Sequence, residues 1–216
     1  GFKVGILDAD VYGPNISTIL SSDEIIVDTL ETSSGTKFVP HVVDGIKIIS
    51  VGMLAEEGQS LAWRGPILTR LLKQFMFDVQ WEDLDFLLID LPPGTGDVQL
   101  SLCQKAELSG AIIVSTPQDV SLIDAKKAID MLNGLKVPVL GLIENMSNYI
   151  CPKCGHEAEI FGHGGVRAEA SKMGLPFWGE IPLDLEIRLS GDAGKPVATG
   201  DGSTSEGIFL EAINAM

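Results

Sequence analysis

Basic residues are few in this sequence. Lysine and arginine together number 15, against 30 aspartates and glutamates in 216 residues, which gives a formal net charge of −15 at pH 7. Proteins that bind nucleic acid neutralise its phosphates with clustered basic side chains, and no such cluster occurs along this chain. We therefore expect no nucleic-acid partner.

Long apolar runs are also lacking. A helix that crosses a bilayer needs about 20 consecutive apolar residues, and the sequence has no run of that length. Nor does it begin with the basic and then apolar residues of a secretory leader. We expect no membrane partner and a cytoplasmic location.

Cysteine is scarce, and its count is odd. The three cysteines, two of them in Cys151-Pro-Lys-Cys154, do not resemble the even set of a secreted disulfide framework. The pair instead indicates a metal site, because two thiolates two residues apart can bind one ion. The third, Cys103, lies on the apolar side of a predicted helix and is interpreted as a small buried residue.

Two thiolates supply half of a closed zinc or [4Fe–4S] site, since each of these needs four ligands. His156 and His163 would complete a zinc site within one chain, whereas a two-fold dimer would bring two Cys-x-x-Cys pairs together. A redox dithiol fits less well, because the pair lies in a long insertion and not at the start of a helix after a strand.

The sequence does contain a regular alternation of short apolar runs and segments with helical periodicity. The predicted strands are residues 3–7, 46–51, 84–89, 111–114, 139–143 and 177–181, and the predicted helices are 16–20, 66–76, 98–106, 121–132, 166–173 and 205–215. A small hairpin or an excursion at the sheet edge is expected within 24–43. This alternation predicts an α/β fold with a three-layer, doubly wound, mainly parallel sheet. We expect a single domain over residues 1–216, with a cysteine-bearing insertion at 146–165.

The predicted strand that ends at Asp90 is followed by Pro92-Pro-Gly94. Open α/β sheets bind their ligands beyond the carboxyl ends of their strands. At that edge Asp90 is suited to hold Mg²⁺, directly or through water, and the backbone N–H of Gly94 can approach a phosphate closely. The alternative is an ordinary strand that ends in an acid before a proline-rich turn.

A second acidic loop, Asp8-Ala-Asp10, follows the first predicted strand. A nucleotide-hydrolysing enzyme needs two such sites, one acid for the metal and one to orient the attacking water. The structural alternative is that Asp8 caps a turn and Asp10 is solvated.

Six motifs, in order, resemble those of the Mrp/ApbC family. They are Asp8-Ala-Asp-Val-Tyr-Gly-Pro14, Trp63-Arg-Gly-Pro66, Leu87–Asp97, Thr116-Pro-Gln-Asp119, Glu144-Asn-Met-Ser147 and Cys151-Pro-Lys-Cys-Gly-His156. Members of this family are iron–sulfur cluster carrier ATPases, related more distantly to MinD, ParA and the nitrogenase iron protein. The resemblance extends from Gly1 to about Val197 and implies a P-loop NTPase fold of the SIMIBI class, deviant Walker A type.

The resemblance also implies roles for particular residues. Asp10 would orient the water that attacks the γ-phosphate, and Asp90 would be the Walker B acid near Mg²⁺. Gly94 would belong to the second switch, which senses the γ-phosphate. Asn145 would hydrogen-bond the adenine edge, and Pro182 would lie in the loop that packs against the base. The ordinary alternatives are that Asn145 is a turn residue at a strand end and that Pro182 only ends a strand.

One family feature does not occur in this sequence. The family has a glycine-rich phosphate loop, Gly-x-x-x-x-Gly-Lys-Ser/Thr, between its first strand and the following helix, and no such motif is found here. The chain also starts at Gly1 and enters a predicted strand directly. We interpret it as a fragment without the first strand and the phosphate loop, and we expect ATP hydrolysis in the full-length family member but not in this chain.

For function, the resemblance implies an ATP-dependent carrier that binds a cluster at a dimer interface. Cys151 and Cys154 of two subunits would share a [4Fe–4S] cluster, with zinc as the competing metal, and ATP with Mg²⁺ would be the second cofactor. The partners would be a second copy of the chain and the apoproteins that receive the cluster. Two alternatives are a regulatory ATPase of the ParA/MinD kind and a zinc-stabilised interaction module without enzymatic activity.

Overall fold

The computed structural model describes residues 1–10, 13–20, 27–33, 35–54 and 65–195. Within these residues the chain divides into two compact units, one formed by Gly1–Glu107 with Gly191–Lys195 and the other by Leu108–Ser190. The predicted terminal helix at 205–215 and the Trp63-Arg64 part of its motif lie outside the described residues. The single domain expected over 1–216 stays a prediction.

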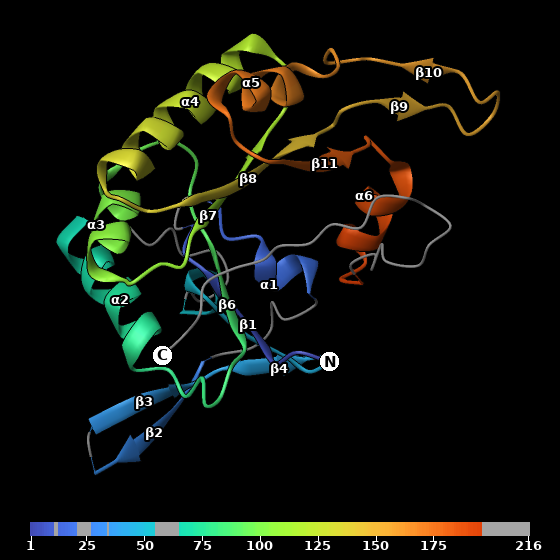
Figure 1. The fold of residues 1–216 in the computed structure, drawn as a ribbon. Coiled ribbons are helices and arrows are strands. Elements are labelled where there is room, and N and C mark those ends of the chain that lie inside the picture. Colours follow the sequence, from blue (N-terminus) through green and yellow to red (C-terminus); the bar gives the residue numbers. More distant parts are fainter. Residues whose placement is uncertain (11–12, 21–26, 34, 55–64, 196–216) are drawn as a thin grey trace. The chain divides into compact units, whose positions relative to one another are not determined.

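The first unit contains a four-stranded sheet with the strand order β4-β5-β1-β6. Its strands are β4 (His41–Val43), β5 (Ile46–Ser50), β1 (Val4–Asp8) and β6 (Phe86–Asp90), of which β1, β4 and β6 are labelled in Figure 1. The strands β5, β1 and β6 run parallel, and β4 is antiparallel to β5. The register places Asp8 opposite both Ser50 and Asp90, so three strands end at the same level of one sheet edge.

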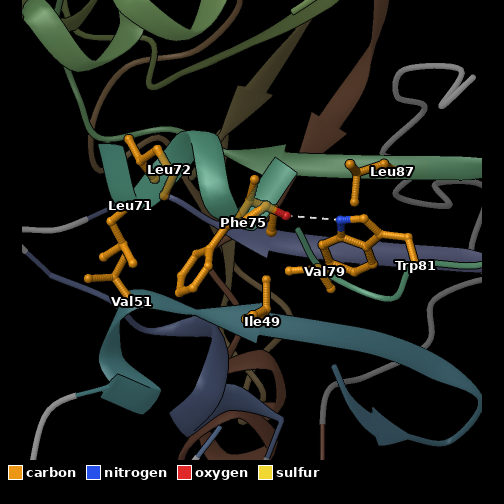
Figure 2. Close-up of a cluster of buried hydrophobic side chains, with 10 residues drawn as sticks. Ile49, Val51, Leu71, Leu72, Phe75, Val79, Trp81 and Leu87 are labelled. Carbon is orange, nitrogen blue, oxygen red and sulfur yellow. Dashed lines mark hydrogen bonds between the residues drawn. The ribbon is translucent and has the colours of Figure 1, made fainter. Parts of the chain in front are cut away.

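Both faces of this sheet are covered, as expected of a parallel sheet. Successive residues of a strand point to opposite faces, so Ile49 packs in the cluster with α2 (Gly65–Phe77), and Ile48 packs with Leu20, which follows α1 (Ile16–Ile19). Figure 2 shows Phe75 of α2 among these buried side chains, with the Trp81 indole nitrogen donating to the Phe75 carbonyl oxygen at 3.0 Å.

The first unit contains further elements besides this sheet and its two covering helices. They are the hairpin strands β2 (Asp28–Thr32) and β3 (Gly35–Val39), the 3₁₀ helix η1 (Val51–Leu54) and the helix α3 (Asp97–Lys105). The hairpin confirms the expectation for residues 24–43, but β4 at the end of that segment instead joins the main sheet.

The second unit contains a three-stranded parallel sheet with the order β11-β8-β7. Its strands are β7 (Ala111–Ser115), β8 (Val139–Asn145) and β11 (Phe177–Ile181). The helix α4 (Asp119–Gly134) packs on β7, and α5 (Gly165–Met173) packs on β8 and on α4. These parallel strands and their crossover helices confirm the predicted α/β class.

Two shorter features follow β8 in the sequence. Between β8 and α5 the chain forms a small antiparallel hairpin, β9 (Tyr149–Ile150) and β10 (Glu157–Ala158), which extends away from α5 in Figure 1. After β11 comes α6 (Leu185–Asp192), a helix with no buried residue, which the sequence analysis did not predict. Across both units, no helix in the described ranges is long and apolar enough to cross a membrane.

Candidate functional site

Asp8 organises the carboxyl edge of the first sheet. Its side chain is fully buried. The Ser50 hydroxyl donates to Asp8 Oδ2 at 2.8 Å, the Ile16 backbone N–H donates to the same oxygen at 3.3 Å, and the Asp10 N–H donates to Oδ1 at 3.1 Å. Ser50 also accepts from the Gly52 N–H at 3.0 Å. These bonds join β1 and β5 to the loop that carries Asp10.

Two carboxyl groups at this edge have raised pKa values. Burial raises the pKa of Asp8 even though three donors favour its charged form. Asp90 is exposed as a residue, but burial of its carboxyl group against the surrounding protein, followed by the nearby charges of Asp8 and Asp10, raises its pKa to about 6. Carboxylates that repel one another in this way are suited to share a divalent cation.

Asp10, the predicted water-orienting residue, lies on the loop that leaves β1. It is half-buried, and its Oδ1 accepts from the Gly13 N–H at 3.2 Å. The structure therefore brings Asp10 to the same edge as Asp8 and Asp90, as the sequence analysis expected for acids at neighbouring strand ends.

The loop after β6 is held by a residue that the sequence analysis missed. Gly94 has a φ of 93°, in the left-handed region that favours glycine. Gln99 of α3 is buried, and its side-chain amide donates to the carbonyl oxygens of Pro92 at 2.6 Å and Pro93 at 3.3 Å. The sequence signal for these hydrogen bonds was the polar Gln99, in the first turn of the helix that follows the proline–glycine loop.

Asn145 and Pro182 belong to the second unit. Asn145 ends β8 opposite Ile181, so the sheet register brings Asn145 next to the residue before Pro182. The Asn145 Oδ1 accepts from the Met146 N–H at 2.9 Å, and Met146 has a φ of 55°. This local hydrogen bond involves the side-chain oxygen of Asn145 and not its amide N–H groups.

Cys151 and Cys154 lie at the turn of the β9–β10 hairpin, and both thiols are free. The Cys151 N–H donates to the His156 carbonyl at 2.9 Å, and the Gly155 N–H donates to the Cys151 carbonyl at 2.9 Å. The backbone N–H of Lys153, with that of Cys154, lowers the pKa of the Cys151 thiol. A turn that stabilises a thiolate in this way fits a soft metal.

His163 does not join these cysteines. Its Nδ1 lies 3.8 Å from Glu144 Oε1, and its Nε2 lies 3.9 Å from Glu180 Oε2. Among the described residues, these three form the one group of at least three potential metal ligands, with ligand atoms within 4.8 Å of one another. The zinc site within one chain that the sequence analysis left open is therefore not assembled around Cys151, Cys154 and His163.

Comparison with known proteins places the fold in the P-loop NTPase class. A MinD ATPase of Pyrococcus furiosus superposes with a TM-score of 0.63 at 19% identity, over 94% of this chain and 80% of that one. A nucleotide-binding protein of Archaeoglobus fulgidus, whose structure was solved in complex with ADP and with cobalt, superposes with a TM-score of 0.76 at 37% identity, over 90% of this chain and 75% of that one.

The family itself is identified by its sequence model. The model of the ParA family described as the NUBPL iron-transfer P-loop NTPase matches residues 1–216, and the chain belongs to this family. An iron–sulfur cluster carrier protein of Deinococcus radiodurans is 50% identical over 218 residues, which cover 100% of this chain. They cover 59% of the Deinococcus protein, so the chain spans little more than half the length of that relative.

Proposed function

We propose that this chain is the core of an ATP-dependent iron–sulfur cluster carrier, in which two copies hold a [4Fe–4S] cluster and pass it to apoproteins. The observation that carries the proposal is the β9–β10 hairpin, which presents two free thiols at its turn in a member of an iron-transfer family. Relatives such as the Deinococcus protein are named iron–sulfur cluster carriers.

The second copy follows from the ligand count. A [4Fe–4S] cluster takes four thiolates, and Cys151 and Cys154 supply two. A two-fold axis beside the hairpin would supply the other pair, because a two-fold interface places the same residues of both copies together. Cys154 is exposed, as this arrangement requires.

The nucleotide would act at the strand ends described above. We propose that Asp90, supported by Asp8, holds Mg²⁺, that Asp10 orients the attacking water, and that Gly94 responds to the γ-phosphate through its N–H. Asn145 and Pro182 would bind the adenine. The ADP bound to the Archaeoglobus relative supports nucleotide binding in this family.

Hydrolysis belongs to the whole protein in this proposal. The phosphate-loop motif does not occur in these residues, so the cradle for the β- and γ-phosphates would come from additional sequence. The cytoplasmic location stays a prediction.

Anaerobic reconstitution with iron and sulfide tests the carrier role. The wild type is expected to gain the broad visible absorption of a thiolate-bound cluster, and Cys151→Ala is expected to lose it. Cys103→Ala is the matched control, because it removes a buried thiol outside the hairpin and should leave the absorption unchanged. Absorption that survives Cys151→Ala would reject the proposal.

Zinc is the competing metal, because sulfur ligands accept both. Metal analysis of the protein as isolated distinguishes bound zinc from a bound iron–sulfur cluster. About half an equivalent of zinc per chain, bound through Cys151 and Cys154 and not displaced by a cluster on reconstitution, would favour a zinc-stabilised module over a carrier.

A further inference from the structure

Glu144 closes the base of the segment that carries the cysteines. It is the residue before Asn145 at the end of β8, where residues 146–165 begin. Its two carboxylate oxygens accept from the other end of the segment. The Gly164 N–H donates to Oε1 and the Val166 N–H donates to Oε2, each at 2.8 Å. One side chain therefore ties the entry of the cysteine-bearing segment to its exit.

A carboxyl group buried as Glu144 is needs partners inside the protein. Glu144 is 0% exposed, and a buried charge is costly unless it is paired and hydrogen-bonded. The N-terminus of α5 supplies the two N–H groups and a partial positive charge. The only side-chain partner recorded for Glu144 in the described part of the chain is His163, at 3.8 Å.

The charges around His163 identify its role. Two carboxylates face its ring, Glu144 from β8 and Glu180 from β11, and Arg167 of α5 pairs with Glu180 at 2.8 Å. Each ring nitrogen of His163 faces a different carboxylate, so the one ring lies between the ends of β8 and β11.

We propose that Glu144, His163 and Glu180 form a clasp that positions Cys151 and Cys154 for the shared metal site. The inference rests on the proposed function. The clasp fixes both ends of the cysteine-bearing segment to β8 and β11, so the hairpin keeps one orientation without metal. A metal site shared by two copies needs an ordered hairpin in each copy. A hairpin that became ordered only on binding would lose conformational entropy, which lowers the affinity for the metal. The clasp contributes no ligand. It acts through the segment that presents the ligands.

The test uses cobalt(II) alone as the probe, added to the reduced protein under anaerobic conditions. The measurements are the thiolate-to-cobalt absorption band and the rate of cobalt release to a chelator. His163→Gln removes the ring that lies between the two carboxylates and is expected to speed release by about tenfold, as loss of a residue that orients metal ligands does. The band should keep its position, since the ligands do not change. His163→Lys places an ammonium group near the same two carboxylates and should return the rate to that of the wild type.

Glu144→Gln should speed release at least as much as His163→Gln, and Glu169→Gln is its matched control. Glu169 is a buried carboxylate of α5 that pairs with Lys126 and Lys172, outside the clasp. Thermal unfolding of each metal-free variant identifies any that fails to fold, and His163→Gln at a half-exposed position remains informative if Glu144→Gln does not.

The outcomes separate the two proposals. Release from His163→Gln at the wild-type rate, or no rescue by His163→Lys, would overturn the clasp while leaving the carrier role intact. A shifted cobalt band in His163→Gln would make His163 a ligand and also overturn the positioning role. A wild type that forms no thiolate-to-cobalt band would reject the proposed metal site itself, and the clasp with it.

Discussion

At the scale of single residues, the acidic edge of the first sheet is under electrostatic stress. Asp8 is fully buried, Asp90 lies directly across from it in the register, and Asp10 is close enough to contribute to the raised pKa of both. Such clusters of perturbed carboxyl groups are typical of functional sites. The amount by which they lower the free energy of unfolding should be measurable without any ligand.

Asp90 predicts a specific dependence of stability on pH. Its folded pKa of about 6 lies above the ordinary value of 3.8, so the folded state binds this proton more tightly than the unfolded state does. The contribution of Asp90 to stability is therefore most favourable at low pH and is lost as the pH rises from about 4 to about 6.

Asp90→Asn should accordingly stabilise the protein at pH 7.5 and have little effect at pH 4. Because the side chain is partly exposed, solvent screening limits the gain to about 1 kcal/mol or less. Urea unfolding at several pH values measures it, with Asp130→Asn on the exposed face of α4 as the control. An equal effect of Asp90→Asn at both pH values would contradict the raised pKa of Asp90 in the folded protein.

At the scale of elements, the side chain of Trp178 on β11 packs directly against Gly141 of β8. A Cβ atom at Gly141 would lie 2.2 Å from the Trp178 indole nitrogen, which donates to the Leu140 carbonyl oxygen at 3.0 Å. Glycine here permits both the strand pairing and the indole hydrogen bond.

Gly141→Ala should therefore lower the free energy of unfolding by about 1 to 3 kcal/mol, because the indole must move and lose its bond. Gly134→Ala, near the end of α4 with open space around it, should be neutral or slightly stabilising. Equilibrium unfolding in urea compares the two, and equal stabilities would contradict the described packing.

The same elements show what could be predicted from the sequence. The apolar runs of β1, β6, β7 and β8 identified those strands, and helical spacing identified α2, because these patterns follow directly from burial. The helix α6 was missed because it has no buried residue and so lacks that signal.

Some residues of the candidate site could be predicted from the sequence and others could not. Asp8, Asp10 and Asp90 were found as acids at strand ends, and Cys151 and Cys154 by their spacing. Ser50, Gln99 and the Glu144 clasp were not, because their partners depend on the strand register and on segments distant in the sequence. Polar residues within apolar runs, such as Ser50 and Glu144, carried the available signal.

At the scale of the whole molecule, the proposed carrier requires two copies to share one metal centre. Each chain offers a prepared pair of thiols at a hairpin turn, and the family resemblance in sequence extends over all of residues 1–216. Two pairs complete the four thiolates of a [4Fe–4S] cluster, so assembly state and iron content should change together.

The most direct test is the mass and iron content of the anaerobically reconstituted protein, by light scattering coupled to gel filtration and by iron analysis of the same peak. A cluster shared by two copies predicts a particle of twice the 23.0 kDa chain with about four irons per two chains, and a monomer without iron for Cys151→Ala. A monomer that holds a full cluster, or a dimer that forms without iron and retains none after reconstitution, would contradict a cluster shared between two copies.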